Sequence, residues 1–226
     1  YFERGPSMEV NQDKIVGYTV DMLDEIFKDS NLSYELDFLP WSRCLALVKG
    51  GQVDMLVDAT YNSARALTYF ISLPYYTNNY HYFYSKKTHP KGLSIKNMDD
   101  IKNNYKLCGL RGYSYAYLEP ANIMQEVDSY KQLIQVLHYR PEVCEIFTEG
   151  FELFAGFSKI QENYLGDPDL AHAKIPGDEP RAFHMMTGRE NPRGLSIRDF
   201  VDRGIVNAQK SGAMDKIWEK HFGSNK

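Results

Sequence analysis

The sequence predicts an α/β fold organised as two lobes, each with a mostly parallel sheet flanked by helices. Two observations carry this prediction. The first 57 residues alternate between extended and helical patterns in the order β-α-β-α-β. A second series of strand, turn, helix and strand patterns follows between residues 106 and 147, and helical patterns close the chain. At 226 residues the chain is long enough for one large domain or two small ones.

The amino-terminal part of the chain supplies the first β-α-β-α-β series. Residues 1–10 should form a strand and the turn after it. A helix opens at Gly17, with apolar side chains on one face at helical spacing, and a second helix covers residues 42–49. Apolar side chains alternate at residues 34–38 as in a half-buried strand, and residues 53–57 form a short apolar strand bounded by turn residues.

The central part of the chain repeats this organisation. Residues 80–84 are an extended aromatic run that predicts a long strand leaving the first lobe. Residues 106–110 and 143–147 predict two more strands, and a helix carrying Leu133 and Leu137 lies between them. We therefore expect a second lobe built from strand, turn, helix and strand.

The carboxyl-terminal part returns to the first lobe. Residues 166–180 are rich in Pro, Gly and Asp and predict surface loops. Residues 182–187 are apolar enough for a return strand, and helices are expected at residues 195–207 and 213–222. The expected lobes are residues 1–84 with 187–226 for lobe 1, and residues 85–186 for lobe 2.

Composition excludes several classes of function. A net charge of -4, with scattered basic residues, gives no footprint for nucleic acid. No apolar run approaches the roughly 18 residues of a membrane span. The three cysteines show neither C-x-x-C spacing nor a companion histidine cluster, which argues against zinc, and we expect no cofactor. The 17 tyrosines suit a recognition cleft, but they suit a core equally well.

The stretch from Gly50 to Tyr76 holds the strongest functional signal. After the apolar strand, Asp58 and Thr60 bring hydrogen-bonding side chains to the strand's carboxyl end, where open α/β sheets bind ligands. Arg65 closes the loop, and its planar guanidinium can hold a carboxylate through two parallel hydrogen bonds. An exposed surface arginine is the alternative interpretation.

This stretch resembles the extracytoplasmic solute-binding proteins of the polar amino-acid class. Their pattern here is G-x-x-D, a short strand, a Ser/Thr-rich turn, Arg, and then F-S-x-P-Y. The chain matches it, with Ile71 inserted, at Gly51, Asp54, Thr60, Arg65, Phe70, Ser72, Pro74 and Tyr75. The similarity extends over nearly the whole chain, to a closing element at Ser211, Gly212, Ile217, Lys220, Phe222 and Gly223. It implies a type II periplasmic-binding-protein fold, two hinge strands, and binding of the ligand's α-carboxylate by Arg65.

The resemblance implies further ligand-binding residues. Ser114 matches a family residue that contacts the carboxylate, although an ordinary helix N-cap is the alternative. Tyr113 departs from the small residue usual there. Glu149 replaces a family Asp that pairs with the ligand's ammonium group, or it is an acidic residue in a first helical turn. Trp41 matches an apolar ligand-contacting position, or it is a core aromatic.

Asp58 stands where the family usually has a small hydroxyl residue. If Asp58 and Glu149 both face the ligand, a ligand with an extra positive charge is favoured over an acidic one. Asp58 could instead pair with Arg65, which would weaken carboxylate capture. Cys108 and Cys144 lie on strands expected to be neighbours, so an oxidising compartment would permit a disulfide, unless the two side chains face opposite sides.

The resemblance implies a monomeric binding protein, periplasmic or else extracellular and membrane-anchored, that closes its lobes around a small zwitterion and delivers it to an ABC-type permease. Two alternatives stay open. One is the sensing domain of a membrane receptor with a kinase or cyclase region. The other is an enzyme similar to cyclohexadienyl dehydratases on the same fold, with Glu149 or Asp58 as general acid. The sequence shows no nucleophile elbow and no phosphate-binding loop, and we expect no enzymatic activity.

Overall fold

The computed structural model describes residues 9–11, 14–37, 39–111, 113, 115–118, 125–151, 154 and 163–223. The chain divides into two compact units, which are unit 1 (residues 1–77 and 182–226) and unit 2 (residues 78–181). Both contain helices and sheets, so the predicted α/β class is confirmed. The lobe boundary predicted at 84/85 falls inside a strand of unit 2, residues 80–85, and the one predicted at 186/187 falls inside the strand of residues 181–188, so the predicted lobe boundaries stay a prediction.

Unit 1 is built from both ends of the chain. Its helices are α1 (Tyr18–Phe27), α2 (Trp41–Lys49), α3 (Ser63–Thr68), α7 (Gly194–Lys210) and α8 (Ala213–Phe222). Its strands are β1 (Glu9–Asn11), β2 (Lys14–Val16), β3 (Met55–Thr60), β4 (Tyr69–Ile71), β5 (Tyr76–Asn78) and β11 (Arg181–Gly188). The helices predicted near residues 17, 42, 195 and 213 are therefore present.

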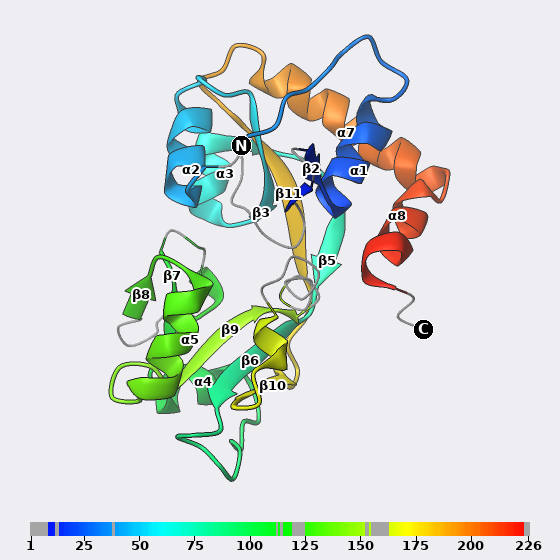
Figure 1. Ribbon diagram of the computed structural model, residues 1–226. Helices are drawn as coiled ribbons and strands as arrows, with labels where there is room; N and C mark the ends of the chain where they lie inside the picture. Colours follow the sequence, from blue (N-terminus) through cyan, green and yellow to red (C-terminus); the bar gives the residue numbers. More distant parts are fainter. Residues whose placement is uncertain are drawn as a thin grey trace. The chain divides into compact units, whose positions relative to one another are not determined.

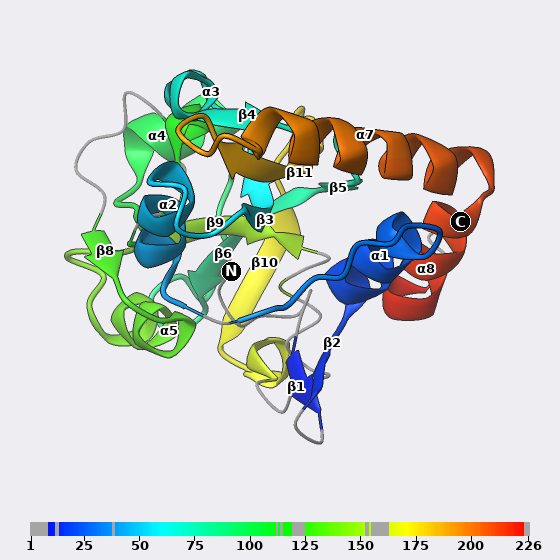
Figure 2. The same ribbon diagram turned by 90° about the horizontal axis from the view of Figure 1, so that it is seen from above.

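The sheet of unit 1 is organised around β11. The strand order is β3-β11-β4, and β5 also pairs with β11 (Figures 1 and 2). Both β3 and β4 run antiparallel to β11. The expectation of a mostly parallel sheet is therefore wrong for these strands, because a strand from the carboxyl-terminal segment enters the sheet in the opposite direction.

Helices α1, α7 and α8 lie side by side in unit 1 (Figures 1 and 2). The apolar face of α1 is fully buried at Tyr18, Met22 and Leu23. The axes of α1 and α7 approach closely at Gly204, where an added Cβ would lie 2.6 Å from the Ile26 side chain. A larger residue at this position would force the two helices apart.

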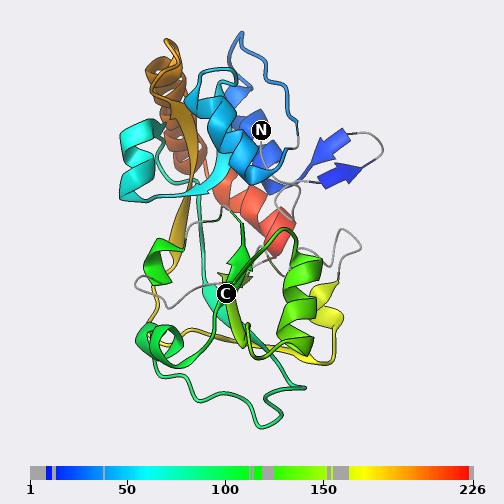
Figure 3. The same ribbon diagram turned by 90° about the vertical axis from the view of Figure 1, so that its left-hand side faces the viewer.

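Two short segments precede α2. Strands β1 and β2 pair with each other antiparallel and are drawn in blue in Figure 3. The strand predicted at residues 34–38 is absent at residues 34–37, and residue 38 lies outside the described part. The Tyr34 hydroxyl donates to the Asp24 carboxylate of α1 instead, so this segment is attached to a helix rather than to a sheet.

Unit 2 is continuous in sequence. Its helical elements are α4 (Met98–Asn104), α5 (Tyr130–Tyr139) and the short 3-10 turns Ala116–Leu118 and Tyr164–Gly166. Its strands are β6 (Tyr80–Ser85), β7 (Cys108–Leu110), β8 (Gln125–Val127), β9 (Ile146–Gly150) and β10 (Leu170–Lys174). Three of these helices and strands, α4, β8 and β10, are absent from the sequence-based prediction.

The main sheet of unit 2 has the order β10-β6-β9 and is antiparallel throughout. A second pair, β7 and β8, is parallel, and a single parallel bridge joins Leu107 to Ile146. The surface loops predicted at residues 166–180 thus contain an edge strand, β10, in which apolar and polar residues alternate from Ala171 to Lys174.

A cluster of apolar side chains forms the core of unit 2. Helix α5 contributes Leu133, Ile134 and Leu137, and the sheet contributes Phe83 and Phe147, whose rings stack 4.7 Å apart. Among the helices of the described residues, none is both long and apolar enough to cross a bilayer.

Candidate functional site

Arg65 is positioned by the residues immediately before it. The Asn62 side chain accepts a hydrogen bond from the Arg65 backbone N–H at 2.7 Å and so caps α3. The Arg65 guanidinium Nη1 donates to the Thr60 carbonyl at 2.8 Å and to the Thr60 hydroxyl at 3.0 Å. The residue is only 9% exposed. Contacts within residues 60–65 therefore hold both the backbone of this arginine and its charged group in place.

Trp41 lies against the same guanidinium. The central carbon of the Arg65 guanidinium is 5.5 Å from the centroid of the Trp41 ring, within the range of a cation–π interaction. Trp41 is the first residue of α2, where Pro40 provides the N-cap. The structure thus brings together three residues that the sequence singled out, from α2, β3 and α3. A guanidinium has five N–H donors, so it can hold a carboxylate while it keeps its contacts to Thr60.

Asp58 belongs to the same strand as Thr60. Its carboxylate accepts hydrogen bonds from the hydroxyls of Thr19, at 2.8 Å, and Tyr76, at 3.2 Å. The sequence-based prediction placed Asp58 and Thr60 in a loop after the strand. They lie within β3 because its pairing with β11 continues as far as Thr60.

Glu149 is the corresponding buried charge of unit 2. It lies within β9, opposite His81 of β6, so the predicted position at the start of a helix is wrong. The Tyr130 hydroxyl donates to Glu149 Oε2 at 2.5 Å, and the Gly150 backbone N–H donates to Oε1 at 2.7 Å. Burial, and then the charge of Glu149, raise the pKa of Tyr130 well above its usual value.

Three further polar residues of unit 2 have no counterpart in the sequence-based prediction. The Tyr117 hydroxyl lies 2.8 Å from the hydroxyl of Thr148, the neighbour of Glu149 in β9. The Arg181 guanidinium lies 3.8 Å from the Tyr117 ring centroid and 4.0 Å from that of Tyr80. The tyrosine content was the one available signal, since Arg181 is distant in sequence from both rings.

Two predicted residues follow β7. Tyr113 is partly buried against the apolar core of unit 2, and its ring centroid lies 6.5 Å from that of Tyr115. Packing against the core accounts for a bulky side chain here. Ser114 lies outside the described residues, so its predicted contact with a carboxylate stays a prediction.

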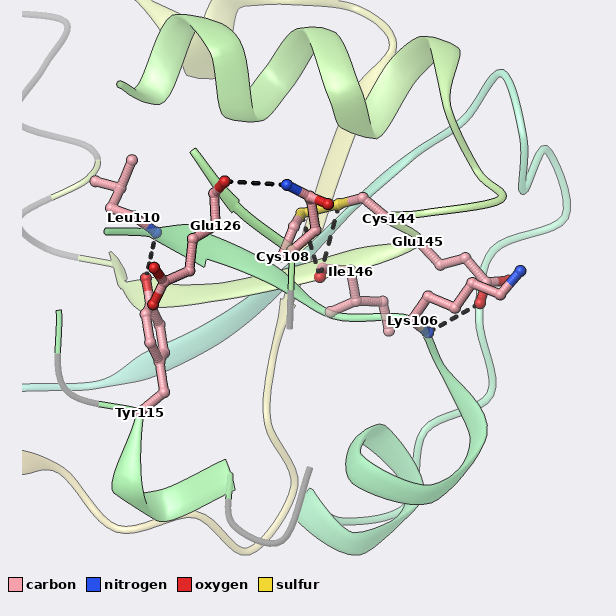
Figure 4. The surroundings of a disulfide bond; sticks show 9 residues. Lys106, Cys108, Leu110, Tyr115, Glu126, Cys144, Glu145 and Ile146 are labelled. Carbon is pink, nitrogen blue, oxygen red and sulfur yellow. Dashed lines mark hydrogen bonds between the residues drawn. A yellow bond between two sulfur atoms is a disulfide. The ribbon is translucent and has the colours of Figure 1, made fainter. Parts of the chain in front are cut away.

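Cys108 and Cys144 are joined by a disulfide, which links β7 to the turn before β9 (Figure 4). The Tyr115 hydroxyl accepts a hydrogen bond from the Leu110 backbone N–H at 2.8 Å, at the end of the same strand (Figure 4). The disulfide therefore braces the segment that leads into Tyr113 and Tyr115. Cys44, in unit 1, is buried and free.

A hydrogen-bonded series of Ser85, His138 and Asp167 superficially resembles a hydrolytic triad. His138 Nδ1 lies 2.7 Å from the Ser85 hydroxyl, and its Nε2 lies 3.0 Å from the Asp167 carboxylate. Ser85 is fully buried, so no substrate can reach its hydroxyl. The series ties β6, α5 and the segment before β10 together. Among the described residues there is no group of three or more His, Cys, Asp or Glu that could hold a metal ion.

Comparison with known proteins identifies the family of the chain. Residues 4–224 match the sequence profile of the bacterial extracellular solute-binding proteins, family 3. The chain belongs to this family. Its membership confirms the resemblance identified in the sequence and assigns the protein to a class that binds solutes outside the cytoplasm. No curated protein matches the chain in sequence.

Several solved structures share the fold of this family member. One is an amino acid ABC transporter substrate-binding protein from Streptococcus pneumoniae bound to L-arginine (19% identity, 98% of this chain and 92% of that chain, TM-score 0.75). Another is an arginine-, lysine-, histidine-binding protein from Geobacillus stearothermophilus (21% identity, 100% and 94% coverage, TM-score 0.75). A third is an ABC uptake transporter substrate-binding protein from Streptococcus pneumoniae with bound histidine (15% identity, 99% and 91% coverage, TM-score 0.75). These similarities show the fold.

Proposed function

We propose that this solute-binding protein captures a small zwitterionic, amino-acid-like ligand in the periplasm and delivers it to the permease of an ABC transporter. The observation that carries this proposal is the Arg65 group of unit 1. A guanidinium held by Thr60 and flanked by Trp41 offers planar donors to a carboxylate and an aromatic face beside it. The structural neighbours that bind arginine and histidine support the choice of ligand class.

Further predicted residues complete the proposal. Glu149 supplies a negative charge for the ligand's ammonium group, Ser114 a hydroxyl for its carboxylate, and Tyr113 an aromatic edge. We propose that the protein acts as a monomer, because capture and release of a small solute require no second copy.

The proposed role involves no covalent chemistry. Glu149 is fixed by hydrogen bonds from Tyr130 and the Gly150 backbone, which suit the charged form of the carboxylate rather than the protonated form that a general acid requires. Incubation with prephenate or arogenate, followed by absorbance of the aromatic product, tests this point. Turnover above the background rate would move the protein to the dehydratase alternative.

A thermal-shift screen tests the binding function. The twenty L-amino acids, together with polyamines and dipeptides, are added singly to the folded protein, because a ligand that binds only the folded state raises the melting temperature. We expect a saturable shift with at least one α-amino acid. In Arg65→Ala this shift is lost, since a buried anion would then lack its partner.

Arg193→Ala is the matched control. Arg193 belongs to unit 1 as well, but its side chain is 73% exposed and forms a surface salt bridge with Asp54 at 2.8 Å. It should keep the wild-type ligand response, with little change in stability. If no α-carboxylate compound stabilises the wild-type protein, or if Arg65→Ala responds as the wild type does, the carboxylate-binding role is wrong.

A further inference from the structure

Two histidines of unit 2 meet on one face of its main sheet. In the register of β6 on β10, His172 lies opposite Phe83, and His81 comes two residues before Phe83 in β6. His81 and His172 are therefore diagonal neighbours on the same face, within reach of each other's side chains. Their Nδ1 atoms lie 3.0 Å apart. Strand β10 is at the edge of this sheet and His172 is exposed, so solvent reaches the pair.

A phenylalanine holds both imidazole rings in place. The Phe151 ring stacks on that of His81, with centroids 4.3 Å apart, and on that of His172, with centroids 4.9 Å apart. Phe151 itself packs against the apolar core of unit 2, and its backbone N–H donates to the Asn79 carbonyl at 2.8 Å. The two imidazoles therefore start from fixed positions close to each other, which reduces the entropy lost when both bind one ion.

Two nitrogens at this separation suit adjacent ligands of one transition-metal ion. Bonds from a metal to a histidine nitrogen are about 2.0–2.1 Å long. Two nitrogens 3.0 Å apart that each lie at this distance from one ion make an angle of about 90–95° at the ion. This angle is typical of adjacent ligands in the square-planar or tetragonal sites of Cu²⁺ and Ni²⁺. A tetrahedral zinc site would hold the two nitrogens about 3.3–3.4 Å apart.

Both imidazoles are neutral at neutral pH, as metal ligands must be. Burial, and then the charges of His172 and Lys174, lower the pKa of His81 to about 4, and burial lowers the pKa of His172. In the hydrogen bond between the two rings, one Nδ1 carries the proton and the other accepts it. An ion takes the place of this proton, which moves through solvent to the Nε2 atom of the same ring. Metal binding therefore leaves both rings neutral.

We propose that His81 and His172 form a binding site for a divalent transition-metal ion, with Cu²⁺ bound most tightly. The inference goes beyond the proposed function and does not depend on it. No third histidine, cysteine or acidic residue joins the pair in the part of the chain that the structure describes, so water occupies the other positions around the ion. Two protein ligands make an exchangeable site rather than a structural one. The bound ion links the edge strand β10 to β6.

The experiment is a calorimetric titration with Cu²⁺ at pH 7 in a buffer that does not bind metals. It compares the wild type with His81→Gln and His172→Gln. Each variant should bind Cu²⁺ at least about 10-fold more weakly, because loss of a ligand costs at least as much as loss of its outer-shell partner. His89→Gln is the matched control, since His89 also belongs to unit 2 and is partly exposed, and it should bind as the wild type does. Zn²⁺ should bind the wild type more weakly than Cu²⁺.

Electron paramagnetic resonance of the Cu²⁺-loaded protein gives a second readout, which does not depend on affinity. The wild type should show coupling of the copper to nitrogens of two imidazoles, and each single variant to one at most. Circular dichroism establishes that each variant is folded. Because His172 is exposed, His172→Gln should keep the wild-type fold, and it tests the site even if the half-buried His81 cannot be replaced without loss of stability.

Four outcomes would overturn the inference. Equal Cu²⁺ affinity in the wild type and in His172→Gln would mean that the pair only forms a hydrogen bond between two strands. Coupling to a single imidazole, or loss of affinity in one of two folded variants alone, would mean that the two rings do not bind the same ion. Equal weakening in His89→Gln would mean that Cu²⁺ binds surface histidines without selection. Tighter binding of Zn²⁺ than of Cu²⁺ would contradict the angle assigned to the site.

Discussion

Arg65 of unit 1 and Glu149 of unit 2 are buried to the same extent, at 9% exposure each, yet the two charges are held in different ways. Two hydrogen-bond partners of Arg65 are close in sequence, since Thr60 lies five residues before it and Asn62 three, although the Trp41 ring of α2 also lies against it. Glu149 accepts from its neighbour Gly150, but also from Tyr130, which lies 19 residues away and comes from another element. A charge fixed by its own neighbours can be found from a sequence pattern. The surroundings of a charge fixed by distant residues become visible only in the fold.

The largest effect is expected from removal of the disulfide of unit 2. Cys108 and Cys144 enclose a separation of 36 residues, so their replacement by Ser should destabilise unit 2 by about 3–4 kcal/mol. Both tryptophans, Trp41 and Trp218, belong to unit 1. In a urea titration, tryptophan fluorescence follows unit 1, and far-UV circular dichroism follows both units.

We expect the circular dichroism transition of this double variant to begin at a lower urea concentration than the fluorescence transition. Cys44→Ala, in unit 1, is the matched control and should not separate the two. If both transitions of the double variant shift together, the units unfold as one cooperative whole, and the contrast between them does not extend to stability.

The second prediction concerns the long-range partner of Glu149. Tyr130→Phe removes the hydroxyl that donates to its carboxylate and should cost about 1–3 kcal/mol, because a buried charged acceptor loses a hydrogen bond. Tyr69→Phe in unit 1 is the control, since the Tyr69 hydroxyl donates to the uncharged Leu45 carbonyl at 2.8 Å. Its cost should be about 1 kcal/mol. Chemical denaturation measures both, and equal costs would argue against a charged Glu149.

The third prediction concerns the local support of Arg65. Asn62→Ala removes the cap of α3 and should cost about 1 kcal/mol of stability. Ser129→Ala removes the equivalent cap of α5 in unit 2, with a similar cost. Calorimetry with the best ligand of the screen should show weaker binding in Asn62→Ala alone. Equal affinities in the two variants would show that the cap does not position Arg65 for the ligand.

The smallest effect is expected from pH. Burial favours the neutral form of Asp21 in unit 1, but hydrogen bonds and charges from Lys220 and His221 outweigh it and lower the pKa below 3.8. For Asp167 in unit 2, burial is likewise outweighed by hydrogen bonds from the Asp169 backbone and from His138, which lower the pKa. Each carboxylate thus adds stability that is present above about pH 4 and lost as the pH falls through the folded-state value.

Unfolding midpoints measured between pH 6 and pH 2.5 test this expectation. The wild-type protein should lose stability as the pH falls over this range. In Asp21→Asn and in Asp167→Asn this loss of unfolding free energy should be smaller by less than about 1 kcal/mol, since both groups are partly exposed. If either variant loses more stability at low pH than the wild type does, the pKa of that carboxyl is not lowered in the folded state.

Local patterns predicted much of the fold. The helical periodicity around Leu23 and Leu133 indicated α1 and α5, and the range predicted for α8 agrees with the structure. The absence of α4 from the prediction was avoidable, because Asn97 caps it and two acidic residues follow in its first turn. The antiparallel pairing was not predictable from local patterns, since it depends on the entry of β11 between β3 and β4.

Some features of the candidate site were likewise predictable from the sequence, and others were not. Arg65 and Thr60 were found because a motif places them five residues apart, and the structure brings them into contact. Glu149 was singled out in the sequence, but its position in β9 and its contact with Tyr130 were not anticipated. No sequence pattern could place Arg181 against Tyr117, because the two are separated by more than sixty residues. The ligand-binding roles of Arg65, Thr60 and Glu149 stay predictions.

The position of β11 in the sheet of unit 1 sets the order in which the chain can fold as it emerges from synthesis or export. Because β3 and β4 both pair with β11, neither has its main partner until residue 188 is available. Unit 2 is contiguous from residue 78 to 181 and is complete earlier. We therefore expect the middle of the chain to reach its structure first, while the amino-terminal 77 residues wait for the carboxyl-terminal segment.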